Sequence, residues 1–232
     1  MKHGFLWLTD HTGLCIKVGR YRYLPTFIHI MNRKNRKNQE ILKTIKKRGI
    51  FRIRDLKTTG IHPEYVRRLL KKGVIRREGK GVYALETMEP TEHHSLAEIA
   101  KRVPHGVVCL ISALRFHDFT TQLPHQIWVA IDVKAKAPKV KDIAARIVRF
   151  SGEALKQGIE EHNIEGVKVK IYSPAKTVAD CFKYRNKIGL DVALEALREC
   201  IRKRLATRDD IFRFAKICRV ANIILPYLES LS

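Results

Sequence analysis

The sequence predicts an α+β protein in which an N-terminal winged helix-turn-helix is followed by a larger mixed α+β domain with a helical C-terminal half. Three observations predict this fold. The chain has 232 residues, of which 45% are hydrophobic, enough for one large domain or two small ones. Breaks in the apolar periodicity at residues 33–37 and 86–94 isolate a short basic segment. That segment carries three helical patterns and then two strand patterns, whereas strands followed by helices dominate the rest.

These breaks divide the chain into three parts. Residues 1–37 form a basic N-terminal extension, or result from a misassigned start codon, because Met31 offers an alternative start. Residues 38–88 form the predicted winged helix-turn-helix, and residues 89–232 form the larger domain. The three parts carry 8 basic and 1 acidic, 14 and 5, and 24 and 17 residues respectively. Positive charge is therefore concentrated in the first 88 residues.

The overall charge predicts the class of partner. A formal net charge of +23 indicates a polyanion, most simply double-stranded DNA, with an anionic membrane as the weaker alternative. The longest apolar stretch, Val107–Ile111, is far too short to span a bilayer, and the apolar start at Phe5–Leu8 ends too soon for a secretory signal. We therefore expect a cytoplasmic protein that does not bind membranes. Five widely separated cysteines predict neither a disulfide framework nor a zinc ribbon.

The basic segment contains the elements of a winged helix. In order, they are a helix from Asn38 to about Arg48, a short helix around Asp55 and Leu56, a helix from Pro63 to Lys72, and strands Val74–Glu78 and Val82–Leu85. Ile41, Leu42 and Ile45 lie at helical spacing in the first helix. Pro63 fits the first position of the third helix, and Gly73 fits its left-handed cap. The two strands form a hairpin through a Gly79–Gly81 turn.

The third helix is the predicted recognition helix. Val66, Leu69 and Leu70 form an inward stripe and leave the opposite face cationic. Such a helix fits the ~12 Å major groove, where residues near its N-terminus reach base edges. The candidate DNA-binding residues are His62, Glu64, Tyr65 and Arg68 for base edges, Arg67, Lys71 and Lys72 for the backbone, and Arg76, Arg77 and Lys80 on the wing for phosphates or an adjacent minor groove. Tyr65 could equally pack inward, and the whole module could instead dock a protein.

The larger domain is expected to begin with a helix and to contain a short sheet. The predicted elements are a helix over 96–102 capped by Ser95 and Glu98, a buried helix over 106–116, strands 126–132 and 147–150, and a hairpin within 158–172. Helices are then expected from Ser173-Pro174 to Tyr184, after Gly189, from Thr207 to Cys218, and over 223–231 with an interruption at Pro226.

Three patterns suggest other chemistry. Asp132-Val133-Lys134 resembles half of a metal-dependent nuclease site, but its nearest upstream acid, Asp118, is not on a predicted strand. Ala175-Lys176-Thr177 lacks the glycines of a phosphate-binding loop. The histidines have no metal-ligand spacing. We therefore expect no catalytic residue, no cofactor and no metal site, and we expect that the protein is not an enzyme. A nuclease targeted by the winged helix is the alternative. The larger domain could also bind RNA through Lys134, Lys136, Lys139 and Lys141.

Over about residues 38–232, the sequence resembles the AbiEi antitoxins of bacterial type IV toxin-antitoxin systems, which are also called abortive-infection (phage defence) proteins. In the first module the resemblance rests on Gly49-Ile50-Phe51, Gly60-Ile61, Lys72-Gly73-Val74-Ile75-Arg76-Arg77 and Gly81-Val82-Tyr83. In the second it rests on Val103-Pro104-His105-Gly106-Val107-Val108-Cys109-Leu110-Ile111-Ser112-Ala113-Leu114, His125-Gln126-Ile127-Trp128 and Tyr172-Ser173-Pro174-Ala175-Lys176-Thr177-Val178-Ala179-Asp180. The second set is the more specific.

The resemblance implies a protein with two activities. The winged helix would bind inverted repeats in the promoter of its own operon and repress it. The larger domain would counter a nucleotidyltransferase toxin encoded next to it, without requiring a stable toxin-antitoxin complex. The N-terminal 30 residues fall outside the family pattern.

Overall fold

A computed structural model describes residues 7–9, 15–17, 39–47, 49–57, 60–120, 122, 124–138, 140 and 143–231. The chain divides into two compact units, Met1–Thr44 and Ile45–Ser232. In the first unit, strands β1 (Trp7–Thr9) and β2 (Cys15–Lys17) pair antiparallel, although the sequence has no sustained strand pattern there. The basic run at 33–37 and the possible start at Met31 lie outside the described residues.

The winged helix has the predicted elements in the predicted order, with one additional two-residue strand before the second helix. A helix covers residues 39–47, and it is followed by β3 (Phe51–Arg52), α2 (Ile53–Lys57), α3 (Pro63–Lys71), β4 (Ile75–Gly79) and β5 (Val82–Leu85). The strands form an antiparallel sheet in the order β3-β5-β4. Pro63 begins α3 as predicted, and Gly73 has the left-handed conformation (φ +65°) that ends it. Leu70, which the sequence placed in the inward stripe, is 38% exposed.

The larger domain is built on a five-stranded sheet in the order β8-β7-β6-β10-β9. Its elements are α4 (His94–Arg102), β6 (Val107–Val108), α5 (Leu110–Phe116), β7 (Ile127–Asp132), β8 (Ala145–Phe150), α6 (Glu153–Lys156), β9 (Ile159–Ile164), β10 (Val167–Tyr172), α7 (Pro174–Lys183), α8 (Arg185–Ile188), α9 (Leu190–Arg202), α10 (Arg208–Cys218) and α11 (Ala221–Ser230). Two pairs, β10–β6 and β7–β8, are parallel, and the others are antiparallel. This mixed architecture confirms the predicted α+β class.

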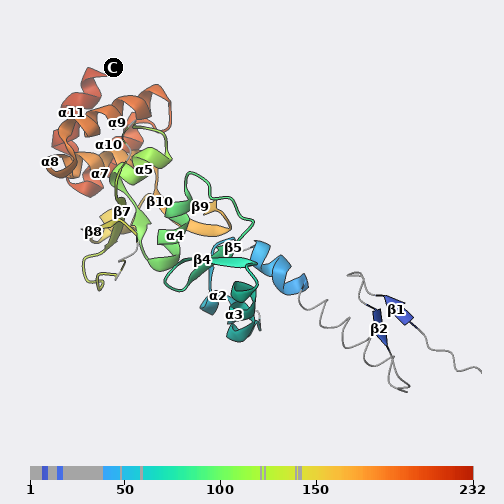
Figure 1. The fold of residues 1–232 in the computed structure, drawn as a ribbon. Coiled ribbons are helices and arrows are strands. Elements are labelled where there is room, and N and C mark those ends of the chain that lie inside the picture. Colours follow the sequence, from blue (N-terminus) through green and yellow to red (C-terminus); the bar gives the residue numbers. More distant parts are fainter. Residues whose placement is uncertain are drawn as a thin grey trace, which may run out of the picture. The chain divides into compact units, whose positions relative to one another are not determined.

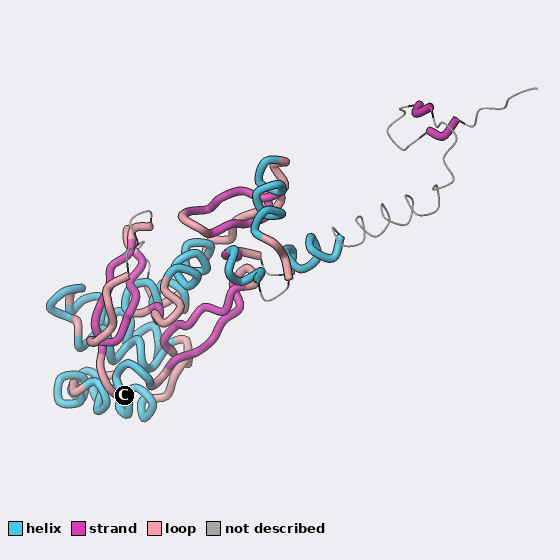
Figure 2. Tube along the Cα trace, turned by 90° about the horizontal axis from the view of Figure 1, so that it is seen from below, coloured by secondary structure: helices cyan, strands magenta, loops and turns pink. Residues whose placement is uncertain are grey.

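The two faces of the larger sheet bury different partners. One face packs against α5 and the C-terminal helices, which gather on that side of the sheet (Figure 1). The other face packs against α4, which lies next to the β4–β5 hairpin. The wing hairpin and the larger sheet remain separate ribbons (Figure 2). The larger sheet is therefore the middle layer of three. None of the described helices is both long enough and apolar enough to cross a membrane.

One apolar run adopts a different structure from the predicted buried helix over 106–116. Residues Val107 and Val108 form strand β6 in the interior of the sheet, and the helix begins only at Leu110. Both valines are buried, one in each of the two clusters that cover the faces of the sheet. A short strand buried on both faces is as continuously apolar as a buried helix, so periodicity cannot separate the two.

Two predicted helix caps are wrong in detail. His93, rather than Ser95, is the cap residue of α4, and Glu98 instead pairs with Arg102 one turn further on. Ser173 does occupy the cap position of α7, but its side chain makes no cap hydrogen bond. Thr207 does cap α10, where its hydroxyl accepts a hydrogen bond from the Asp210 amide. The identity of a capping residue thus predicts the start of a helix better than it predicts the bond.

Pro226 does not interrupt the last helix as predicted, because α11 runs through it from Ala221 to Ser230. Ile224 and Leu228, which flank the proline, are both buried in the larger core. Packing of these side chains holds the helix together where proline removes a backbone hydrogen bond.

Candidate nucleic-acid interface

Helix α3 is positioned by its buried face and by a side-chain cap. Val66 and Leu69 are 2% and 5% exposed and fix the helix on the winged-helix core. The Nδ1 atom of His62 accepts a hydrogen bond from the Glu64 amide at 3.2 Å. Because Nδ1 is the acceptor, the neutral imidazole carries its proton on Nε2 and can offer it as a donor. His62 is exposed, so this donor lies at the surface beside the helix N-terminus.

The opposite face of α3 is exposed and strongly basic. Arg67 and Arg68 are exposed, and so are the two lysines at the end of the helix, Lys71 and Lys72. Arg67 forms an ion pair with Glu64 at 3.3 Å, and both side chains remain largely in solvent. Such a pair contributes little stability, so the guanidinium can exchange it for a phosphate.

Tyr65 is half-buried, so its burial does not decide between the two roles predicted for it, packing against the core and contact with a base edge. Burial raises the pKa of its hydroxyl. The phenol is therefore a neutral hydrogen-bonding group at the edge of the helix face, suited to either packing or contact.

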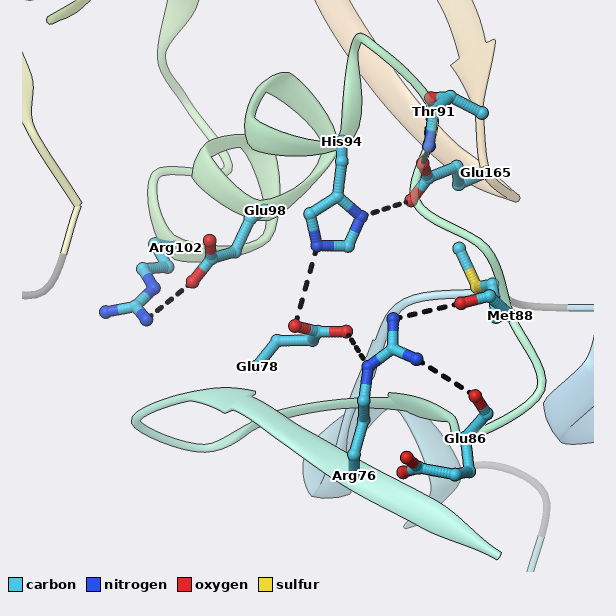
Figure 3. Close-up of polar contacts among 9 residues, drawn as sticks. All are labelled: Arg76, Glu78, Glu86, Met88, Thr91, His94, Glu98, Arg102 and Glu165. Atoms are coloured by element: carbon cyan, nitrogen blue, oxygen red, sulfur yellow. Dashed lines mark hydrogen bonds and ion pairs between the residues drawn. The ribbon is translucent and has the colours of Figure 1, made fainter.

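The cationic residues of the wing differ in their exposure and in their hydrogen-bond partners. Lys80 and Arg77 are exposed, and the Arg77 Nε donates to the Gly79 carbonyl at 3.1 Å. Arg76 is partly buried and bound by other parts of the protein. Its Nε donates to Glu78 at 2.7 Å, and its two terminal nitrogens donate to the Glu86 and Met88 carbonyls, each at 3.0 Å (Figure 3). Of the ten predicted contact residues, Arg76 alone has a guanidinium committed to three internal acceptors.

The Arg76 contact continues as a chain of charged groups into the larger domain. Figure 3 shows His94, at the start of α4, between the carboxylates of Glu78 and Glu165. Its Nδ1 lies 2.8 Å from Glu165, and its Nε2 lies 3.6 Å from Glu78. The other carboxylate oxygen of Glu165 accepts hydrogen bonds from the Thr91 amide and hydroxyl. Burial alone would raise the pKa of Glu165, but these Thr91 and His94 bonds lower it below the usual value. Glu165 is therefore ionised, and through His94 it links the larger domain to Glu78 of the wing.

A second attachment lies at α2. Lys101 on α4 donates to the Asp55 carboxylate at 2.9 Å, and both side chains are about one-fifth exposed. Burial raises the pKa of Asp55, but the contacts with Lys101 and the Arg52 amide bring it below the usual value. The residues of both attachments are separated by up to 74 positions in sequence, and no local pattern reveals such pairs.

Apolar packing joins the same two regions. Ile50, Val82 and Ala84 of the winged helix are fully buried. They belong to one cluster with residues of α4, β6, α5 and the β9–β10 hairpin. The winged helix and the larger domain thus share a continuous core.

The other chemical patterns have structural explanations in the described residues. The Asp132 carboxylate accepts a hydrogen bond from the Lys134 amide at 2.7 Å, which stabilises the turn after β7. No group of three or more His, Cys, Asp or Glu side chains that could hold a metal occurs within the described ranges. Lys176 is fully buried, with its ammonium on the Asp180 carboxylate. Of the proposed RNA-binding lysines, Lys134 and Lys136 are exposed, and Lys139 and Lys141 lie outside the described residues.

Comparison with protein families identifies the module that carries this surface. The family model described as "Transcriptional regulator, AbiEi antitoxin" matches residues 39–85. The match confirms the resemblance to AbiEi antitoxins over these residues. The matched residues contain α3 and the wing, so the part of the chain that is similar to AbiEi transcriptional regulators is the part that carries the basic surface. The larger domain lies outside the matched residues, so its sequence motifs remain a resemblance.

Solved structures add support for the fold alone. The crystal structure of the RV2827C protein from Mycobacterium tuberculosis is similar, with a TM-score of 0.51 and 12% sequence identity. The alignment covers 72% of this chain and 66% of that chain. No curated protein matches the chain.

Proposed function

We propose that this protein represses its own operon by binding promoter DNA through α3 and the wing. The observation that carries the proposal is the division of α3 into a buried face at Val66 and Leu69 and an exposed face with four cations. A helix fixed in this way can enter the major groove without unfolding its own core. His62, Glu64, Tyr65 and Arg68 would then meet base edges, and Arg67, Lys71 and Lys72 would meet phosphates.

On the wing, Arg77 and Lys80 would hold phosphates or an adjacent minor groove. Arg76 has a different role in this proposal. Because its guanidinium already has three acceptors, it would fix the position of the wing instead of binding phosphate.

We further propose that the protein is the antitoxin of a nucleotidyltransferase toxin encoded beside it, and that the larger domain counters that toxin without a stable complex. The resemblance of residues 103–114 and 172–180 to AbiEi antitoxins supports this part, and the cytoplasm is the compartment in which both activities would occur. Co-expression tests it: Arg68→Ala should derepress the operon and still protect cells from the toxin. Loss of protection in a stable, well-expressed variant would refute the separation of the two activities.

The DNA-binding proposal is tested by fluorescence anisotropy with operator and unrelated duplexes. Arg68→Ala should weaken operator binding by about 1–3 kcal/mol and reduce discrimination, whereas Lys71→Ala should weaken both duplexes and lower the salt slope by about 0.9. Lys216→Ala, which removes an exposed lysine from α10, is the matched control. If neither α3 variant differs from this control, α3 is not the recognition helix.

A further inference from the structure

A hollow of about 430 Å³ lies between strand β8 and helix α8 of the larger domain. Its wall contains three cations, Arg146, Arg149 and Lys187, and two aromatic side chains, Trp128 and Tyr184. No carboxylate is among the described residues that line it. The combination of positive charge with aromatic surface is typical of sites that bind nucleotides.

Aromatic rings position two of these cations without neutralising them. The Arg146 guanidinium lies 4.3 Å from the centre of the Trp128 ring, and the Lys187 ammonium lies 5.5 Å from that of Tyr184. Both cations are exposed. In the part of the chain that the structure describes, neither forms an ion pair with a carboxylate. Their charge therefore remains open to an anionic ligand.

Hydrogen bonds and a ring contact fix the remaining wall. Arg149 donates to the carbonyls of Asp132, Val133 and Ala135, which ties β8 to the turn after β7. The half-buried Tyr184 stacks on Phe150 and donates its hydroxyl to the Arg149 carbonyl at 3.3 Å. These contacts hold the ring and the strand in place before any ligand arrives.

Strand β8 adds backbone donors, because among the described strands it lies at the edge of the sheet and pairs with β7 alone. The carbonyls of Ala144 and Phe150 accept hydrogen bonds from β7 and the residue after it. By the alternation of a parallel ladder, the N–H groups of Ile147 and Arg149 are directed away from β7. This edge therefore offers N–H donors beside the cations, together with the carbonyl oxygens of the same two residues, of which that of Arg149 already accepts from Tyr184.

We propose that the hollow binds an unpaired nucleotide of a single-stranded nucleic acid. Arg146 and Lys187 hold the phosphates, and the base lies against the ring of Tyr184. A duplex keeps its bases paired and stacked, so it cannot place one of them in this hollow, whereas a single strand can turn one out. The site uses none of the residues of α3 or the wing and goes beyond operator binding.

The test compares two double variants of the full-length protein. Arg146→Gln/Lys187→Gln removes the two cations of the hollow. Arg213→Gln/Lys216→Gln is the matched control on α10: it removes the same charge, and its cations also lie near rings, at 5.0 Å from Phe214 and 4.7 Å from Phe212. Equal thermal unfolding of both proteins checks that they are folded.

Binding is measured with labelled single strands of about 12 nucleotides, within the ~4–16 nucleotide range of single-strand sites. The hollow variant should bind them about tenfold more weakly than wild type, and the control should differ by less than about threefold. Both should bind operator duplex as wild type does. Ribose and deoxyribose strands, run in parallel, identify which nucleic acid is preferred.

A strand of the same length without bases tests the role of Tyr184. Wild type should prefer the strand with bases, and Tyr184→Leu, which keeps both cations, should lose most of that preference. Equal losses in the two double variants would mean that only net charge matters and would overturn the proposal. Unchanged binding in the hollow variant would overturn it as well.

Discussion

Neighbouring residues of the same type have different environments in the wing. The sequence predicts both Arg76 and Arg77 as phosphate contacts, because composition alone cannot tell them apart. In the structure, successive side chains of β4 alternate between the two faces of the hairpin, so Arg76 points to its internal acceptors and Arg77 to solvent. The environment of each arginine follows from this alternation and from the larger domain beside one face.

This difference predicts opposite effects of two adjacent substitutions. Arg76→Ala should lower the free energy of unfolding by about 1.5–3 kcal/mol, because it removes charged hydrogen bonds to Glu78 and to two carbonyls. Arg77→Ala should change stability by no more than about 0.5 kcal/mol and should weaken operator binding. Urea unfolding and anisotropy titrations measure the two effects. If Arg76→Ala left stability intact and Arg77→Ala lowered it, the roles would be reversed.

At the scale of elements, the winged helix could be predicted closely because its signals are local. Pro63 at a helix start and Gly73 at a helix end act through the conformation of their own backbone. The sheet of the larger domain was harder to predict. Strand β6 is only Val107 and Val108, and its place between β7 and β10 depends on residues far away in sequence. The attachment through Glu165 could not be predicted either, because its partners also lie far away in sequence. The exposed face of α3, in contrast, could be predicted from helical periodicity.

The turn between β9 and β10 comes close to the backbone of the winged helix. Gly49, with φ +58°, lies so near the Glu165 carbonyl that an added Cβ would sit 1.7 Å from its oxygen. Gly60, with φ +70°, has the same type of backbone and nothing within 4 Å of such an atom. Substituting these two glycines therefore separates two contributions to the free energy of unfolding. Both substitutions strain the backbone, but only that of Gly49 also disturbs the contact with the turn.

Gly60→Ala should therefore lower the free energy of unfolding by about 1–2 kcal/mol, the cost of a left-handed conformation with a side chain. Gly49→Ala should lower it by clearly more, on the order of 4 kcal/mol, because the added methyl group also displaces the Glu165 turn. Chemical denaturation of both variants gives the comparison. Equal losses would show that the turn moves away freely and that the contact between Gly49 and Glu165 is not tight.

At the scale of the whole molecule, DNA binding and the larger domain are joined mechanically. The wing is held by a charged chain through His94, α2 is held by Lys101, and a shared apolar cluster lies between them. An element attached in this way cannot reorient without breaking polar and apolar contacts together. The larger domain therefore supports the geometry with which α3 and the wing would meet a duplex, in addition to its proposed role against the toxin.

The shared core predicts that residues 38–88 are not stable when isolated. Ile50, Val82 and Ala84, which are fully buried in the full chain, would lose the covering residues of α4 and β10. A module of about 50 residues has little other core to compensate. In circular dichroism melts, this fragment should unfold at a much lower temperature than the full chain, or without a cooperative transition. A fragment extended to residue 103 regains α4, with Leu96 against the same cluster and Lys101 on Asp55, and should melt higher. Identical melts of the two fragments would mean that the winged helix folds independently of its neighbour.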